Sequence, residues 1–312
     1  MPDSQQNTLK NPNSVSNYGG QALIEGVLIR GRKYFGIALR TPEGEIITAT
    51  DSISSSNKIL HYLKSIPFVR GLSILAESMV IGSRSLRWSS AIAAGDTTER
   101  SKIPALGKSG AVGLVITLSI SIGFFFIIPV LFSSLSYTFF PIRWLSLFIE
   151  GFSRLLFLVG YIWVIGKSDE IRRVFQYHAA EHQTIQAYEQ QTQINVASIR
   201  RQAKEHPRCG TSFLLTVVLV SGILLIFVGS GPFWWHIASR ILFIPIIAGI
   251  AYEIIRIGSK KQSFFPIKLL LTCNIALQKL TTSKADDEQI QVAIAAFEAV
   301  RNVEDNEGQD LL

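Results

Sequence analysis

Two histidines lie four residues apart in the stretch Y-H-A-A-E-H-Q-T-I-Q, residues 177–186. The surrounding segment, 170–190, has good helix formers and no glycine or proline, so it predicts a helix. Residues four apart on a helix face the same way, which lets His178 and His182 present two imidazoles to one ion. Glu181 can then reach a water bound to that ion as a general base, the arrangement of the inverted zincin pattern H-x-x-E-H.

The cofactor that this pattern favours is a divalent metal ion, zinc above all, which lowers the pKa of a bound water to about 7. The alternative is an exposed helix with two incidental histidines. A second cluster, H-P-R-C-G-T-S at residues 206–212, offers His206 or Cys209 as a third ligand. A turn role for His206 and a small buried thiol for Cys209 stay open as alternatives. Arg208, between them, is a candidate to steady a developing oxyanion.

Two further carboxylates are possible additional site residues. Glu25 lies among apolar and glycine residues in Y-G-G-Q-A-L-I-E-G-V-L-I-R-G, either as an edge charge or as part of a site. Glu253 lies near the end of an apolar run, where a carboxylate is costly unless it is paired or bound to metal. Its alternative is an ion pair with Arg256. A third acid, Glu150, is expected to pair with Arg154 at i+4.

These residues must be positioned by a largely apolar chain. The 312 residues are 48% apolar, and the apolar residues gather in long uncharged runs between polar ends, which is typical of an integral membrane protein. The formal net charge of +7 fits acidic lipid headgroups or the positive-inside rule. No nucleic-acid motif with a basic-aromatic pattern is present, so nucleic acid is not an expected partner. Two cysteines are too few for a disulfide framework and are expected to be free thiols.

Four apolar segments are predicted to cross the membrane as helices, and they are residues 111–135, 144–165, 212–228 and 237–255. Lysines and arginines gather in the segment between the second and third spans, whereas the short connections on the other side carry only Arg143 and Arg240. Because positive residues mark the cytoplasmic side, both termini and the histidine-containing segment are predicted to be cytoplasmic.

The fold class predicted from these patterns is an α-helical integral membrane protein of about four transmembrane helices, with a small cytoplasmic region near the N-terminus that contains a β-hairpin. The predicted divisions are a disordered tail (1–17), an α+β cytoplasmic or interfacial region (18–110), transmembrane helices 1–2 (111–165), a cytoplasmic H-x-x-E-H segment (166–211), transmembrane helices 3–4 (212–255), and an interfacial segment with a C-terminal amphipathic helix (256–312). Within the last division, residues 264–280 are expected to be re-entrant, interfacial or a marginal fifth crossing. Ser283 is expected to cap the final helix.

Five blocks of the sequence occur in the same order as in a known family. They are G-G-Q-A-L-I-E-G-V-L-I-R-G, P-F-V-R-G, Y-H-A-A-E-H-Q-T-I, H-P-R-C-G-T-S-F, and L-Q-K-L-T-T followed by D-D-E-Q-I-Q-V-A-I. With them the chain resembles the YqhQ-like family, bacterial membrane proteins of unknown function described as predicted metal-dependent enzymes. The resemblance implies a bacterial inner or plastid-type membrane. It also implies that the matched motif positions are the site residues, namely His178, Glu181, His182, His206 and Cys209.

Two hypotheses about function follow. The first is a membrane-embedded metal-dependent hydrolase that works at the cytoplasmic face, among membrane lipids, on an unknown membrane-associated substrate. The alternative is a non-enzymatic scaffold or accessory protein, whose H-x-x-E-H helix binds a partner or a structural metal. Structural zinc sites are saturated by four protein ligands, whereas catalytic sites keep one position open, so the geometry around the histidines distinguishes the two.

Overall fold

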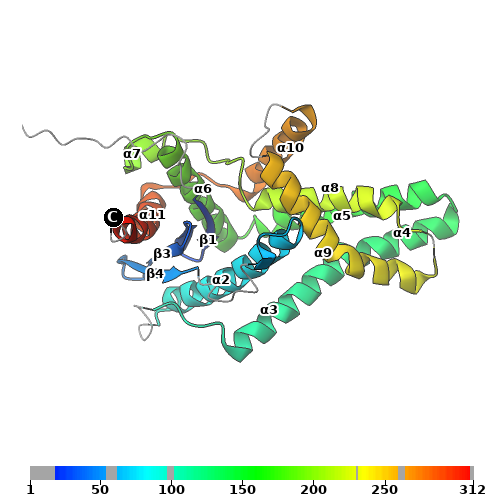
Figure 1. Cartoon of the computed structure of the whole chain (residues 1–312), viewed down its shortest axis with the longest axis horizontal. Coiled ribbons are helices and arrows are strands. Elements are labelled where there is room, and N and C mark those ends of the chain that lie inside the picture. Colours follow the sequence, from blue (N-terminus) through cyan, green and yellow to red (C-terminus); the bar gives the residue numbers. More distant parts are fainter. Residues whose placement is uncertain (1–17, 54–61, 97–101, 230, 259–263, 310–312) are drawn as a thin grey trace, which may run out of the picture.

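A computed structural model of the chain describes residues 18–53, 62–96, 102–229, 231–258 and 264–309 (Figure 1). The predicted N-terminal tail lies outside these residues. The strands are β1 (Gly19–Leu23), β2 (Gly26–Arg30), β3 (Tyr34–Arg40) and β4 (Ile46–Ser52). The helices are α2 (Val69–Ala93), α3 (Gly107–Ile122), α4 (Ile128–Phe139), α5 (Arg143–Ile165), α6 (Asp169–Glu189), α7 (Val196–Ile199), α8 (Thr211–Ile226), α9 (Phe233–Gly258), α10 (Phe265–Thr281) and α11 (Asp287–Gln309).

The four strands form one antiparallel sheet in which each strand pairs with the next along the chain. Gly44, in the turn T-P-E-G (residues 41–44) between β3 and β4, has a φ of 89°, a conformation that glycine adopts at little cost. Glu25 occupies the tight turn between β1 and β2 with a φ of 53°. The expected β-hairpin is therefore confirmed as part of a larger four-stranded meander.

Both faces of this sheet are covered by helices. The side chains alternate along each strand, so that Val27 and Ile29 pack against α6 and α11, while Leu28 between them packs toward α2. Figure 1 shows the strands enclosed by these helices at one end of the molecule. Gly36 lets α11 come close, because a Cβ there would lie 2.8 Å from the carbonyl oxygen of Ala296.

The other end of the molecule is a bundle of apolar helices. Within the described ranges, three helices are long and apolar enough to cross a membrane, namely residues 107–139, 143–165 and 233–258. The first consists of α3, a π-helical segment (Gly123–Ile127) and α4, which has a proline in its first turn. In Figure 1, α4, α5, α8 and the first half of α9 extend away from the sheet.

The third predicted span corresponds to α8, which has only 16 residues. At 1.5 Å per residue it is about 24 Å long, shorter than the roughly 30 Å hydrocarbon core. It packs between α5, α9 and α10. The predicted segment 264–280 is one continuous helix, α10, which lies against α8. Three spans are thus supported by length and composition, and the finer four-crossing arrangement is taken up below as a proposal.

The N-cap of the last helix is Asp286, so the expectation that Ser283 caps it is wrong. The Asp286 carboxylate accepts from the Gln289 N–H at 3.0 Å, and the Gln289 side chain accepts from the Asp286 N–H at 3.0 Å. This reciprocal pair is a capping box. The N–H of Ser283 instead donates to the carbonyl of Phe175 at 3.0 Å, which fixes the chain to α6 before the helix begins.

Candidate metal centre

Helix α6 carries the two predicted histidines and matches the helix predicted over 170–190. Asp169 and Glu170 in its first turn favour the positive end of the helix dipole. Its buried face packs on the sheet and on α11, with Tyr177, Ala180 and Ile185 among the buried residues. The helix is therefore held in place over several turns, and the residues at its middle have fixed positions.

The structure brings His178, His182 and Cys209 together. One ligand-type atom of each lies within 4.8 Å of those of the other two. The Nε2 of His178 is 3.1 Å from the Sγ of Cys209, which lies two residues before the start of α8. His182 is 2% exposed and Cys209 is 8% exposed, whereas His178 is only partly buried.

Two backbone carbonyls set the orientation of both imidazoles. The Nδ1 of His178 lies 2.9 Å from the carbonyl oxygen of Thr281, at the end of α10, and the Nδ1 of His182 lies 2.7 Å from that of Lys204. A carbonyl oxygen only accepts, so each Nδ1 carries the proton and donates it. Each Nε2 then carries no proton and has a free lone pair. Metal-binding histidines have the same arrangement, in which one ring nitrogen donates a hydrogen bond and the other binds the metal.

The Nε2 of His182 is buried and has no hydrogen-bond partner among the residues that the structure describes. The carboxylate oxygen Oε2 of Glu181 is 3.6 Å away, beyond hydrogen-bond distance. Leaving a buried polar atom without a partner costs about 1–3 kcal/mol. An acceptor of this kind, beside a second imidazole and a thiol, is what a cation would satisfy.

Glu181 is positioned by the close approach of strand β1. A Cβ on Gly20 would lie 2.7 Å from the Cγ of Glu181, so only glycine leaves space for this side chain. Glu181 is 3% exposed. Burial raises its pKa to about 8, with His178 opposing that rise and Cys209 adding to it. Sequence reasoning missed Gly20, although the paired glycines of the first block were a signal of close backbone contact.

Burial also determines the protonation of the neighbouring groups. It lowers the pKa of His182 to about 2 and that of His206 to about 4, so both rings are neutral at physiological pH. Burial raises the pKa of the Cys209 thiol, and hydrogen bonds from Thr211 partly offset that rise. Neutral imidazole is the form that binds metals. The thiol would release its proton when a cation binds to the sulfur.

His206 and Arg208 lie beside the three-residue group, in a polar cluster of their own. The ring centroids of His182 and His206 are 5.7 Å apart. The Nδ1 of His206 accepts from the Arg208 N–H at 3.2 Å, and its Nε2 is 3.3 Å from a carboxylate oxygen of Glu189. The Arg208 guanidinium forms an ion pair with the same carboxylate. Glu189 is partly buried in this cluster, with its side chain 25% exposed.

Glu25 lies outside the three-residue group and anchors α6 to the sheet. Its carboxylate accepts from the guanidinium of Arg173, with the Nη2 bond at 2.7 Å, and from the hydroxyl of Tyr177 at 3.2 Å. Both partners lie on α6, Tyr177 directly before His178 and Arg173 five residues before it. The carboxylate is therefore occupied by this tether.

Glu253 also lies outside the group and joins α9 to the start of α2. It accepts from Arg70 at 2.6 Å and from the backbone N–H of Phe68 at 3.2 Å. Arg256, the partner that the sequence suggested, is farther away at 3.9 Å. The ion pair with Arg256 is thus present, and the closer partner, Arg70, belongs to the P-F-V-R-G block, far away in sequence.

Comparisons with known proteins place the chain in a family. A family model described as "Protein of unknown function (DUF1385)" matches residues 66–303. The chain belongs to this family. It is also 33% identical over 297 residues to the uncharacterized protein YqhQ of Bacillus subtilis (strain 168), which covers 92% of this chain and 93% of the relative. No solved structure matches the chain. The resemblance to YqhQ-like proteins is thereby confirmed. Neither description names a substrate.

Proposed function

We propose that the protein is a membrane-embedded metal-dependent enzyme, a hydrolase that acts at the cytoplasmic face of the membrane. The observation that carries the proposal is the buried, unpartnered Nε2 of His182, in a residue grouped with His178 and Cys209 so that one ligand-type atom of each lies within 4.8 Å of the others. Two nitrogens and one thiolate form a ligand set that suits zinc.

The spacing of the three ligand atoms fits an ion after a small adjustment. Ligands at zinc-bond distances in a tetrahedral site are about 3.3–3.8 Å apart. The three atoms lie within 4.8 Å of one another, so at most about 1.5 Å of closure is required. The hydrogen bonds from the two Nδ1 atoms to the carbonyls of Thr281 and Lys204 would hold the orientation of both imidazole rings while the Cys209 thiol moves toward the ion.

Three protein ligands leave one tetrahedral position for water or substrate. A divalent ion held there would lower the pKa of a coordinated water to about 7. Glu181, next to His182 and buried, would take the proton that this water releases, because a bound cation favours the ionised form of a carboxyl this close to it. Arg208, paired with Glu189 at the rim, is the nearest positive charge proposed to steady an oxyanion.

The proposed setting is an integral membrane protein with four crossings and cytoplasmic termini. Support comes from three helices of sufficient length and apolarity, from α8 packed among them, and from the lysines and arginines between α5 and α8. The substrate is proposed to be membrane-associated. The reason is that Cys209, one of the three proposed ligands, lies two residues before α8, a helix of the apolar bundle.

A closed structural site is the alternative, and it would make the protein a scaffold or accessory factor. It needs a fourth protein ligand, and His206 is the nearest imidazole. Both nitrogens of His206 are already hydrogen-bonded, to the Arg208 N–H and to Glu189. This arrangement favours the open site.

Cobalt substitution distinguishes the two. In the purified, detergent-solubilised chain loaded with Co²⁺, a thiolate charge-transfer band should appear and be lost in Cys209→Ser, while Cys273→Ser keeps it. Added azide and a rise in pH should change the visible bands of an open site, and Glu181→Gln should shift the pH midpoint. Bands that respond neither to azide nor to pH would identify a saturated site and contradict the enzyme.

A further inference from the structure

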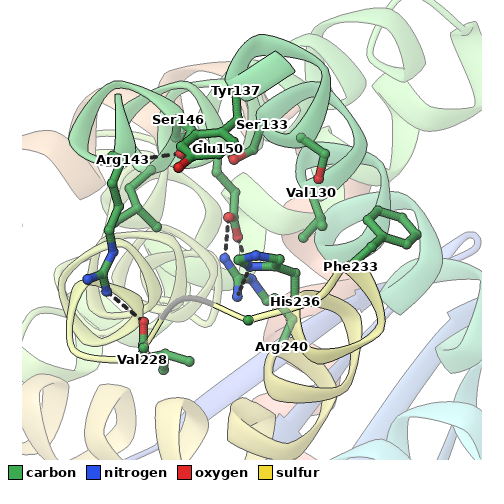
Figure 2. A pocket seen from close by; sticks show the side chains of 14 residues that line it. Val130, Ser133, Tyr137, Arg143, Ser146, Glu150, Val228, Phe233, His236 and Arg240 are labelled. Atoms are coloured by element: carbon green, nitrogen blue, oxygen red, sulfur yellow. Dashed lines mark hydrogen bonds and ion pairs between the residues drawn. The ribbon is translucent and has the colours of Figure 1, made fainter. Parts of the chain in front are cut away.

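A second polar cavity lies at the opposite end of the bundle from the histidines. Helix α8 separates the two, because Cys209 precedes it and Val228, which lines this cavity, follows it. At 1.5 Å per residue, its 16 residues place the two sites about 24 Å apart. The cavity has a volume of about 370 Å³, within the roughly 300–1,000 Å³ range of ligand pockets. Figure 2 shows residues of α4, α5 and α9 around it.

The buried residues Glu150 and Arg240 line this cavity, and Arg154 contacts the Glu150 carboxylate without lining the cavity. The predicted pair of Glu150 and Arg154 is confirmed at 2.9 Å, and Arg240 from α9 joins it with bonds of 2.6 and 3.0 Å to the same carboxylate. Arg154 also donates to the hydroxyl of Ser221 at 2.9 Å. The single carboxylate is therefore already shared by two guanidinium groups, each below 4% exposure.

A third guanidinium, that of the exposed residue Arg143, also lines the cavity. The Nη2 of Arg143 donates to the carbonyl of Val228 at 2.8 Å and to that of Ile226 at 3.1 Å (Figure 2). Among the described residues, all its recorded hydrogen bonds come from this one nitrogen. The three guanidinium groups of Arg143, Arg154 and Arg240, set against one carboxylate, leave a formal charge of +2 in this region. In a low-dielectric setting such an excess favours an anion.

An apolar groove begins beside the polar cavity. It runs between α5 and α8, has a volume of about 550 Å³, and shares the side chain of Leu147 with the cavity. Trp144, the neighbour of Arg143, lines its start and is 70% exposed. Gly151 and Gly222 line the groove and have open space where a Cβ would be. Positive cavity and apolar groove together match a molecule with an anionic head and a hydrocarbon tail.

We propose that this cavity and groove bind one anionic phospholipid, with its phosphate headgroup at Arg143 and one acyl chain between α5 and α8. A phosphate accepts charge-assisted bonds from a guanidinium that has free N–H groups in fork geometry. The continuity through Leu147 favours a lipid over free phosphate. The site rests on the proposed membrane location and is independent of the metal centre.

The test measures equilibrium binding of dioctanoyl phosphatidate to the purified full chain in detergent, with dioctanoyl phosphatidylcholine and inorganic phosphate as comparison probes. Phosphatidate should bind at least about tenfold more tightly than either, the scale of one charged hydrogen bond. Arg143→Gln should weaken phosphatidate binding by at least about tenfold, whereas Arg172→Gln, the same charge change on an exposed residue of α6, should not. Equal binding of the neutral lipid, or unchanged binding in Arg143→Gln, overturns the proposal.

The groove has its own matched pair of variants. Gly151→Leu fills the space beside the proposed acyl chain, and Gly160→Leu adds the same side chain on the same helix, also where a Cβ meets nothing within 4 Å. The first should weaken phosphatidate binding at least about tenfold and leave phosphate unaffected, while the second should change neither. If phosphate binds as tightly as phosphatidate, the lipid is excluded as the occupant. Metal content, which should be the same in all four variants, reports separately on the metal centre.

Discussion

At the scale of single residues, the candidate metal centre depends on groups that aim its ligands. Carbonyls of Thr281 and Lys204 direct the two imidazoles, and Gly20 makes space for the proposed base. The sequence could predict the histidine pair, because i and i+4 are neighbours on any helix. It could not predict which backbone carbonyls accept from the imidazoles, because every residue has a carbonyl. The two that do so are determined by how the end of α10 and residue 204 pack against α6.

Gly20 provides a residue-scale prediction. In Gly20→Ala, the new methyl group would lie 2.5 Å from the Leu28 carbonyl oxygen and 2.7 Å from the Glu181 Cγ, so strand and helix must separate. Overpacking of this kind costs about 1–3 kcal/mol. Thermal unfolding of the detergent-solubilised protein should show the loss. Gly19→Ala, one residue earlier where a Cβ meets nothing within 4 Å, should leave the midpoint nearly unchanged. Equal midpoints for the two variants would contradict the close approach.

At the scale of elements, ion pairs join segments that lie far apart in the sequence. Glu25 joins the β1–β2 turn to α6, and Glu253 joins α9 to α2. Sequence reasoning identified both carboxylates as unusual, because each lies among apolar residues. It read Glu25 as an edge charge or a site residue, and Glu253 as a metal ligand or a partner of Arg256. Their closest partners, Arg173 and Arg70, are more than 140 positions away, and only the tertiary fold brings them near.

Glu77 on α2 provides a prediction about pH. Its carboxylate pairs with Arg30 of β2 and with Lys64 at 2.8 Å. Burial alone would raise the pKa of Glu77, but these two hydrogen-bonded cations outweigh burial and hold it below the usual value. A carboxyl with a lowered folded-state pKa stabilises the fold above its unfolded pKa of about 4.3, and this contribution disappears as pH falls through the folded value.

Glu77→Gln should therefore destabilise the protein at pH 7, by about 1–3 kcal/mol, because two partly buried cations lose their partner. The difference from the natural chain should shrink as the pH is lowered below about 4.3. Thermal unfolding over this pH range measures both effects. Glu298→Gln, on the exposed side of α11, serves as the matched control. A difference that does not depend on pH would mean that the ion pairs contribute nothing.

The capping box of α11 gives a second prediction at this scale. Asp286→Ala removes the acceptor for the Gln289 N–H and should cost about 0.5–2 kcal/mol. Ser283→Ala should cost little, because the bond that this residue gives to Phe175 comes from its backbone. Thermal unfolding of the two variants compares them directly. A larger loss of stability in Ser283→Ala than in Asp286→Ala would mean that Ser283 caps the helix.

At the scale of the whole molecule, a layered sheet-and-helix region and an apolar bundle meet near the candidate metal centre (Figure 1). Composition alone predicted this division, because uncharged runs of more than about 20 residues are typical of membrane spans. The lengths of the helices could not be predicted as well. α8 ends at Ile226 and is shorter than a typical span, while α9 runs from Phe233 to Gly258 and extends past both predicted ends.

Labelling tests the proposed topology. In a chain with Cys273→Ser, which removes the exposed natural thiol, Thr138→Cys lies at the end of α4 and Gln190→Cys lies just after α6. A membrane-impermeant maleimide should label the first in intact cells and the second only after the membrane is opened. Labelling of both from the same side would contradict an odd number of crossings between them.

The central claim is a metal ion held by two histidines and one cysteine, and the direct measurement is the metal content of the purified chain by element-specific mass spectrometry. We expect close to one zinc or similar ion per chain. His182→Ala and Cys209→Ser should each lose it, whereas His236→Ala and Cys273→Ser, which change the same residue types elsewhere, should keep it. Full metal content in His182→Ala, or no metal in the natural chain after loading with zinc, would contradict the account.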